Sequence, residues 1–216
     1  MTRSDLRERF RTENPEVTER VITDALLNDF LFDGDKETCA MTRCVVGDTE
    51  WTSVEDDQYW DLTQKIDNFF DIDEYPGGGV AYDDDRLEKT TIAQLDEESS
   101  AWRTRSSGTP KKYFRRGQYL WFDRPVDDAL TIQVYAVLIS DDFDNDTIMP
   151  FNQLPYLEPF HGGLIKYLQW RVKAKIGKTE EAKTAKQEWL DFVAWMKKEL
   201  GGGKYGIISL RPYDKV

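Results

Sequence analysis

The sequence has few of the residues on which metal sites and many enzymes depend. Its 216 residues include two cysteines and one histidine. Cys39 and Cys44 form no CxxC motif, and with a single histidine they do not supply the ligands of a structural zinc site. They are five residues apart on a predicted helix, so we expect them to point in different directions as two buried side chains without a disulfide.

Recognisable catalytic and nucleotide-binding patterns are also lacking. Nucleophilic catalysis of the Ser-His-Asp or Cys-His kind would have to use His161. That residue precedes Gly162 at the start of a predicted helix, where capping or packing is favoured over general base catalysis. The sequence contains neither GxGxxG nor GxxxxGK[ST]. We therefore predict a protein that is not an enzyme and has no cofactor.

One acidic segment resembles the opening of a calcium-binding loop. Asp142, Asp144 and Asp146 alternate, but the sixth position is Thr147 and the twelfth is Gln153. An EF-hand loop has glycine and glutamate there. We therefore expect no metal site.

Long apolar runs are absent as well. No stretch approaches the ~20 residues that span a bilayer, and the N-terminus lacks the apolar core of a signal peptide. Hydrophobic residues make up 39% and aromatic residues 13% of the chain, which indicates a folded protein. We expect no membrane partner and a protein made in the cytoplasm.

Charge is present in excess, and it is arranged in blocks. The net charge of −12 divides into −2 for residues 1–30, −15 for 31–100, +6 for 101–125, −7 for 126–160 and +6 for 161–216. Alternating blocks suit subunits that meet acidic face to basic face, although each block could equally be an ordinary solvated surface. A sequence-reading DNA-binding protein would need a dominant basic footprint.

Hydrophobic periodicity predicts helices at both ends of the chain and strands between them. Asn14-Pro15 is expected to start a helix that Gly34 ends, and Asp35 to cap another that stops at Gly47. The predicted helices span 3–11, 14–33, 35–46, 90–101, 160–176 and 180–200. The predicted strands span 51–54 and 58–62 as a hairpin, 66–72, 80–82 and 86–88 as a hairpin with an acidic turn, 113–114, 118–123 and a central 130–139.

This order predicts an α+β fold. We expect a helical bundle formed by the N- and C-terminal helices, with an inserted antiparallel β subdomain and an extended C-terminal arm. The boundaries are N-terminal helices at 1–47, the β-rich insertion at 48–140, a Pro-rich connector with the C-terminal helix pair at 141–200, and the arm at 201–216.

Three segments are candidates for contact with partners: residues 6–10, 111–116 and 205–213. In the run KKYFRR, two aromatic residues lie between two basic pairs, which suits contact with an acidic partner or DNA, or else a pleated strand with solvated edges. The apolar tail after the triglycine suits an arm that adds to a neighbour's sheet, or a strand that pairs with its own β subdomain. The candidate interface residues are Leu6, Phe10, Lys111, Arg115, Arg116, Tyr205, Ile207, Ile208, Leu210 and Tyr213.

The order of these parts resembles the head–tail connector (adaptor, or head-completion) proteins of tailed bacteriophages. The resemblance lies in LRERFR and NPEVTERVITDALLNDF, in WRTRSSGTPKKYFRRGQYLWFDRP, and in DNDTIMPFNQLPYLEPFHGGLIKYLQWRVKAKIG with the helix that follows. The matching positions include Trp102, Gly108, Pro110, Tyr113, Trp121, Pro150, Pro155 and His161.

The resemblance implies a virion protein without catalytic residues. It implies a ring, usually dodecameric, that docks beneath the portal, extends the DNA channel and joins the head to tail or neck proteins, with a C-terminal arm that embraces the portal. Double-stranded DNA would pass through without sequence-specific binding. The alternative is a monomeric module whose aromatic-rich β subdomain binds carbohydrate or another surface ligand.

Overall fold

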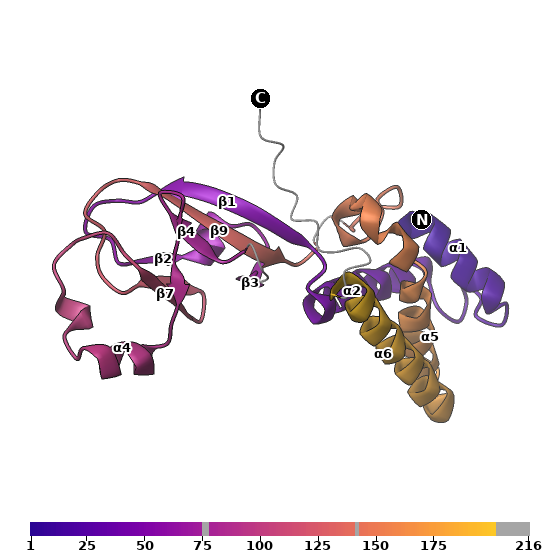
Figure 1. Cartoon of the computed structure of the whole chain (residues 1–216). Coiled ribbons are helices and arrows are strands. Elements are labelled where there is room, and N and C mark those ends of the chain that lie inside the picture. Colours follow the sequence, from indigo (N-terminus) through magenta and orange to yellow (C-terminus); the bar gives the residue numbers. More distant parts are fainter. Residues whose placement is uncertain (75–77, 141–142, 202–216) are drawn as a thin grey trace. The chain divides into compact units, whose positions relative to one another are not determined.

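The chain folds into two structural units, which are described separately. The computed structural model describes residues 1–74, 78–140 and 143–201 (Figure 1). The helical unit combines Met1–Val45 with the described residues from Ile139 onward, and the β unit is Val46–Leu138. With 45% helix and 19% strand, the structure confirms the predicted mixed α+β class.

The helical unit brings together helices from both ends of the chain. Helices α1 and α2 both contact α5, which packs along α6. Gly163 allows this close packing, because a Cβ atom there would lie 2.0 Å from Cζ of Phe192. The α-helices are α1 (Arg3–Glu13), α2 (Asp24–Thr42), α5 (Gly163–Lys175) and α6 (Thr179–Gly201), and the short 3-10 helices are η2 (Phe151–Gln153) and η3 (Pro155–Phe160).

The predicted boundaries of the N-terminal helices are wrong. Asn14 ends α1 instead of starting a helix, since its backbone N–H donates to the carbonyl of Phe10. Gly34 and Asp35 lie inside α2. The glycine is there for packing, because a Cβ atom at Gly34 would lie 2.7 Å from Cδ1 of Tyr167.

Leu6 and Phe10 belong to the core of the helical unit. Both are fully buried on the inner side of α1. The prediction that they contact a partner is therefore corrected, because binding through them would require the unit to open. Beside this buried pair on α1, three arginines form ion pairs with Asp24 and Asp146: Arg3, Arg7 and Arg11.

Two buried titratable groups lie in the helical unit. Asp35 accepts a hydrogen bond from the backbone N–H of Phe151 at 2.8 Å, and burial raises its pKa to about 6. His161 is also buried; its Nδ1 lies 3.0 Å from the amino nitrogen of Met1. Desolvation by burial, together with the nearby N-terminal charge, lowers the His161 pKa to about 4. Both pKa shifts favour the uncharged form of the group relative to its ordinary equilibrium.

Cys39 and Cys44 are free, buried thiols in the same unit. The prediction that they point in different directions is wrong, since their Sγ atoms are 3.9 Å apart. Helix α2 ends before the second cysteine, and Arg43 adopts a left-handed φ of 57° that turns Cys44 back toward Cys39.

The β unit contains two sheets that share one core. Sheet A has the order β1-β9-β4-β5, with β3 also paired to β9, and sheet B has the order β2-β8-β7-β6. Strand β9 is central, as predicted. The strands are β1 (Val46–Thr52), β2 (Tyr59–Asp61), β3 (Phe69–Ile72), β4 (Val80–Tyr82), β5 (Asp85–Arg86), β6 (Glu88–Lys89), β7 (Lys112–Arg116), β8 (Tyr119–Phe122) and β9 (Thr131–Leu138).

Long-range pairing replaces one of the two predicted hairpins. Strand β1 pairs with β9 and β2 pairs with β8, so the predicted hairpin between residues 51–54 and 58–62 is wrong. The predicted hairpin with an acidic turn is confirmed as β4 and β5, which are antiparallel around Asp83 and Asp84. Both aspartates have left-handed φ, 50° and 66°, the pattern of a type I′ turn.

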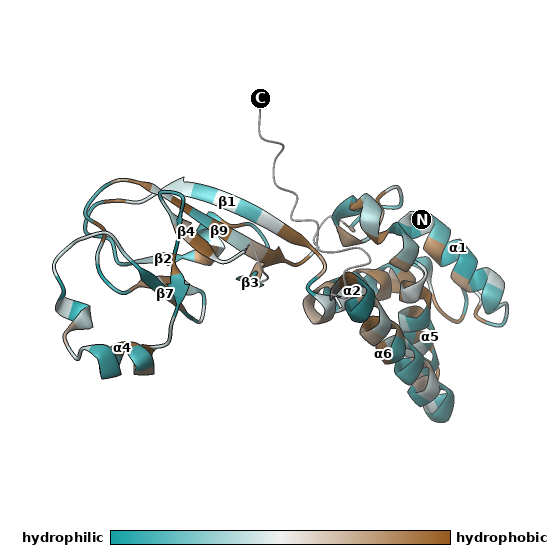
Figure 2. Ribbon diagram, in the orientation of Figure 1, coloured by the Kyte–Doolittle hydropathy of each residue, from teal (hydrophilic) through white to brown (hydrophobic). Residues whose placement is uncertain are grey.

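Apolar side chains from both sheets meet in the core of the β unit. Tyr113, Leu120 and Phe122 from sheet B pack with Ile132 and Val134 from β9. The hydrophobic colouring of Figure 2 follows β9 and β4, as expected for strands at the centre of a core. On the other face of sheet B, α4 (Ile92–Glu98) and η1 (Trp102–Thr104) pack against part of the sheet.

Candidate functional site

The outer face of sheet B carries a row of aromatic side chains. Strand alternation places Tyr113 in the shared core and Phe114 on the opposite face. The pairing register puts Trp121 beside both Phe114 and Tyr59. Three neighbouring strands thus each contribute one ring to the same face.

These rings stack on one another. Tyr59 and Trp121 have centroids 4.5 Å apart at an interplanar angle of 23°, and Trp121 and Phe114 are 6.0 Å apart at 12°. Trp102 meets Phe114 edge to face at 5.5 Å. We call Tyr59, Trp121, Phe114 and Trp102 the aromatic row. Trp102 is fully buried, whereas Tyr59 is 52% exposed, so the row runs from a closed end to an open one.

A groove opens along this row. A cavity of about 210 Å³ is bordered by rings of the aromatic row, by Ile92 and by the polar side chains of Gln58, Arg103 and Arg116. A second, shallower hollow of about 420 Å³ continues past Arg116 and Trp121 to Tyr119. We call the two together the outer groove. The indole Nε1 of Trp121 is buried and has no hydrogen-bond partner among the described residues.

Most cations near the outer groove are already paired. Arg103 lies over Trp102 and bonds to Asp96, which also accepts from the Trp102 indole at 2.8 Å. Arg103 and Trp102 hold the pKa of Asp96 below its usual range. Lys112 forms an ion pair with Glu98, which raises the lysine's pKa.

Arg115 is also paired, because it forms an ion pair with Asp71 and lies over the ring of Phe69. Two other cations of this segment differ from it. Arg116 and Lys111 are exposed, and no hydrogen bond or ion pair of their side chains is found within the described residues. Of these two, Arg116 lines the outer groove, so its guanidinium is available to an anionic ligand.

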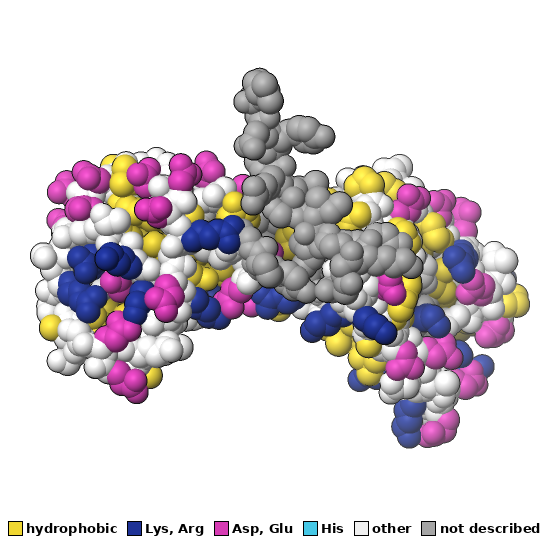
Figure 3. Space-filling view, viewed as in Figure 1, with side chains coloured by type: hydrophobic (Ala, Val, Ile, Leu, Met, Phe, Trp, Pro, Cys, Tyr) yellow, Lys and Arg dark blue, Asp and Glu magenta, His cyan; other side chains and the backbone are white. Residues whose placement is uncertain are grey.

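Three turns of the β unit are acidic. Residues 55–57, 83–85 and 127–128 contribute eight carboxylates and no cation. Hydrogen bonds join these turns: the Tyr82 hydroxyl donates to the carbonyl of Asp128 at 2.9 Å, and the N–H of Asp56 donates to the carbonyl of Val126 at 2.9 Å. We call these turns the acidic end. In Figure 3, acidic side chains gather along the upper rim of the β unit and basic ones below it.

The predicted interface residues therefore have different outcomes. Lys111, Arg115 and Arg116 are exposed on or beside β7, and only Arg116 borders the outer groove. The sequence alone did not predict that Tyr59 and Trp121 would lie on the same face of the sheet as Arg116. The alternation of aromatic residues in YLWF and QYW was the available signal, but their stacking depends on long-range register. The tail candidates Tyr205, Ile207, Ile208, Leu210 and Tyr213 lie outside the described residues.

Other candidate chemistries find structural explanations. Asp146, from the calcium-like segment, is paired with Arg3 and Arg7, which lower its pKa. Within residues 1–74, 78–140 and 143–201, no three His, Cys, Asp or Glu side chains are grouped to hold a metal ion. No helix in the described part of the chain has the length and hydropathy to cross a membrane.

Comparison with known proteins gives no assignment. No protein-family model matches the chain, and no match among curated proteins was found. The outer groove offers stacking, apolar contact and one unpaired guanidinium, which are the means of binding a partner.

Proposed function

We propose that this protein is a head-to-tail adaptor of a tailed bacteriophage virion. In this proposal it forms a ring, with a dodecamer as the expected size, beneath the portal. The ring extends the DNA channel and joins the portal to tail or neck proteins. The basis is the order of sequence segments that resembles such proteins, and the structure supplies supporting observations.

The observation that carries the proposal is the division of the chain into two units. The β unit is inserted between two halves of a helical unit, and each has its own buried core. A subunit of this kind can present different surfaces to its neighbours in a ring, to the portal and to the tail. In the proposed ring, the helices from both chain ends form the bundle, and residues 201–216 form the arm that reaches the portal.

The charge distribution suits the proposed channel. The β unit contains 20 acidic and 10 basic residues, so its net charge is −10. A negative wall repels DNA phosphates and does not retain the duplex as it passes. This is the behaviour required of double-stranded DNA contact without sequence-specific binding.

Mass photometry of the protein mixed with portal rings from the same genome tests the proposal. We expect the portal peak to shift by a whole ring of 25.2-kDa subunits. Replacement of two apolar tail residues, Ile207→Asp with Leu210→Asp, is expected to abolish the shift if the tail embraces the portal. Lys204→Gln serves as a control in the same segment. An unshifted portal peak with wild-type protein in excess would contradict portal docking.

A second candidate function is a ligand-binding module, favoured by the exposed rings of the outer groove. A sugar binds to the face of an aromatic ring, and the faces of Trp121 are occupied by Tyr59 and Phe114. The cavity of about 210 Å³ is also smaller than the ~300 Å³ at which ligand pockets begin, and the hollow of about 420 Å³ beside it is shallow. A glycan-array screen tests this function: saturable binding that Tyr59→Ala removes would favour it over the adaptor.

A further inference from the structure

We infer that the outer groove binds the acidic end of a second copy of this chain, with the β4–β5 turn inserted against Arg116. This inference deepens the proposed function and rests on it, because it identifies the contact between neighbouring subunits in the ring. Both surfaces belong to the β unit.

The groove has the chemistry of a site for an acidic peptide turn. Arg116 has no partner within the described chain, and it lies between the hollow that ends at Tyr119 and the cavity lined by Gln58. A guanidinium can hold a carboxylate through two parallel hydrogen bonds. The aromatic row supplies rigid apolar surface around it, and aromatic residues and arginine are the types enriched at interfaces.

The β4–β5 turn has the shape and charge to occupy that groove. Asp83 and Asp84 are both exposed and form the two-residue tip of a narrow hairpin. The neighbouring turns of the acidic end bring further carboxylates to the same edge. Since the β unit as a whole has a net charge of −10, two copies would repel unless an acidic edge met a basic face.

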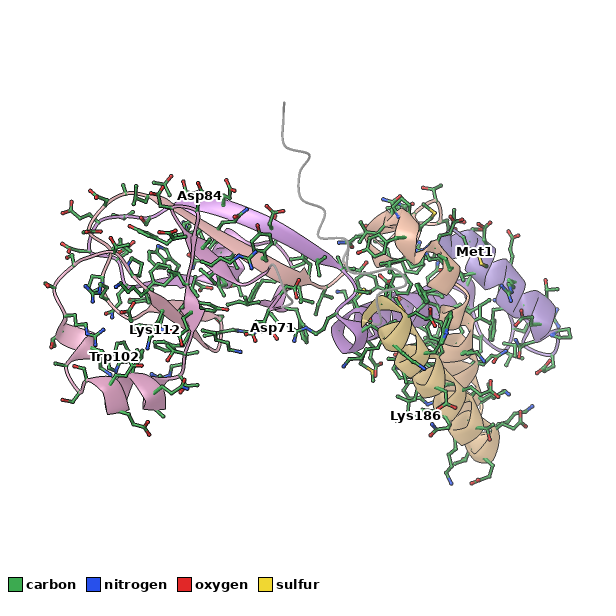
Figure 4. All side chains as sticks on the ribbon, in the orientation of Figure 1. Met1, Asp71, Asp84, Trp102, Lys112 and Lys186 are labelled. Atoms are coloured by element: carbon green, nitrogen blue, oxygen red, sulfur yellow. The ribbon has the colours of Figure 1, made fainter. Side chains whose placement is uncertain are left out.

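The two surfaces lie on different sides of the β unit. The acidic turn belongs to sheet A, whereas the outer groove lies on the face of sheet B that points away from the shared core. Figure 4 places Asp84 at the upper edge of the β unit and Trp102 in its lower part, just above α4. A contact between unlike surfaces is heterologous, so each copy can bind one neighbour on each side, and a rotation that closes gives a ring.

Two variants remove one surface each without disturbing the fold. Arg116→Gln removes an exposed cation that has no described partner. Asp83→Asn with Asp84→Gly removes two carboxylates and installs the Asn-Gly pair that type I′ turns prefer. Circular dichroism of both variants should match the wild type. Lys65→Gln is the control for Arg116→Gln, because it removes an exposed cation from another part of the β unit.

Sedimentation equilibrium up to about 1 mM protein, at low salt, measures the contact. A hairpin tip in a groove buries less than a standard interface of ~1,600 Å², so we expect weak association. The average mass of the wild type should rise with concentration. Each variant should weaken association at least about tenfold, the range expected when one partner of a charged pair is removed, and Lys65→Gln should not.

Mixing the two variants gives the decisive result. The intact acidic end of the Arg116→Gln protein can bind the intact groove of the other variant, so an equimolar mixture should form dimers that grow no further. A wild type that stays monomeric at about 1 mM, variants that associate like the wild type, or a mixture that fails to dimerise would each overturn the contact. A whole-ring shift of the portal peak in that case would leave the adaptor function standing.

Discussion

Each unit contains stacked aromatic rings beside cations, and the two clusters differ in how completely they are enclosed. In the helical unit, Trp170 and Trp189 stack at 5.4 Å, and Arg171 and Lys186 lie over the rings. Tyr167 in this cluster is buried, and its hydroxyl bonds to both Glu37 and Arg171. In the β unit, the aromatic row ends at the exposed Tyr59, and Arg116, which has no partner within the described residues, lines the groove beside Trp121.

The same residue types therefore serve different purposes. Where rings, cations and hydroxyl groups satisfy one another, they stabilise the fold. Where a ring face and a guanidinium remain open to solvent, they are available to another molecule. Substitutions that act on one cluster and spare the other test this distinction.

The largest effect is expected from the enclosed cluster. Trp189 is 1% exposed, and Trp189→Ala should lower the free energy of unfolding of the helical unit by about 3–5 kcal/mol. Urea unfolding followed by far-ultraviolet circular dichroism measures this loss. Trp195→Ala on the same helix is the control, because Trp195 is 46% exposed and its loss should be much smaller. Equal losses would contradict the enclosed character of the cluster.

The buried carboxylate allows the helical unit to be perturbed by pH. Asp35 has its pKa raised from 3.8 to about 6, so its favourable contribution is full below pH 4 and is lost as the pH rises through about 6. Asp35→Asn keeps an acceptor for Phe151 and removes the charge. Relative to wild type, its stability should increase by roughly 3 kcal/mol between about pH 3 and pH 7.

His161 gives the opposite sign. Its pKa is lowered from 6.5 to about 4, so its contribution is full above pH 6.5 and is lost as the pH falls through about 4. His161→Gln should therefore gain stability relative to wild type on acidification. Thermal melts of both variants at a series of pH values measure the two trends, and parallel trends would contradict the assigned protonation states.

The smallest effect on stability is expected at the open end of the aromatic row. Because Tyr59 is 52% exposed, Tyr59→Ala should cost about 1 kcal/mol or less. The same substitution should weaken self-association, since Tyr59 stacks on Trp121, which lines both hollows of the outer groove, and removing it frees that ring to move. Tyr59→Phe keeps the ring and should retain association. A large loss of stability in Tyr59→Ala, with unchanged association, would show that Tyr59 stabilises the fold as the enclosed cluster of the helical unit does.

Elements governed by local periodicity could be predicted from the sequence. Helices α5 and α6 follow clear apolar stripes, and β9 reads as a continuous apolar run, so their existence and the central place of β9 were correctly predicted. The N-terminal boundaries were not. Gly34 has the sequence signature of a helix end, but its absent side chain makes room for Tyr167, a contact far away in the chain.

The arrangement of the outer groove depends on strand pairings between residues that are far apart in the sequence. Arg116 was identified from its basic and aromatic surroundings, and this needed only the local sequence. Tyr59 lies on the same sheet face as Arg116 because β2 pairs with β8 and β8 pairs with β7. The local sequence indicated a hairpin instead, which would have separated those rings. The packing of the whole core determines which strands pair when they are far apart in the sequence. Local patterns of residues do not specify such pairings.

Native mass spectrometry of the protein bound to portal rings tests the central claim most directly. If neighbouring copies contact one another through the acidic end and the outer groove, wild-type protein should occupy portals as complete rings with few partial ones. Arg116→Gln should instead give a spread of partial occupancies. A spread with the wild type, or no bound copies at all, would contradict the account of this chain as a ring-forming adaptor.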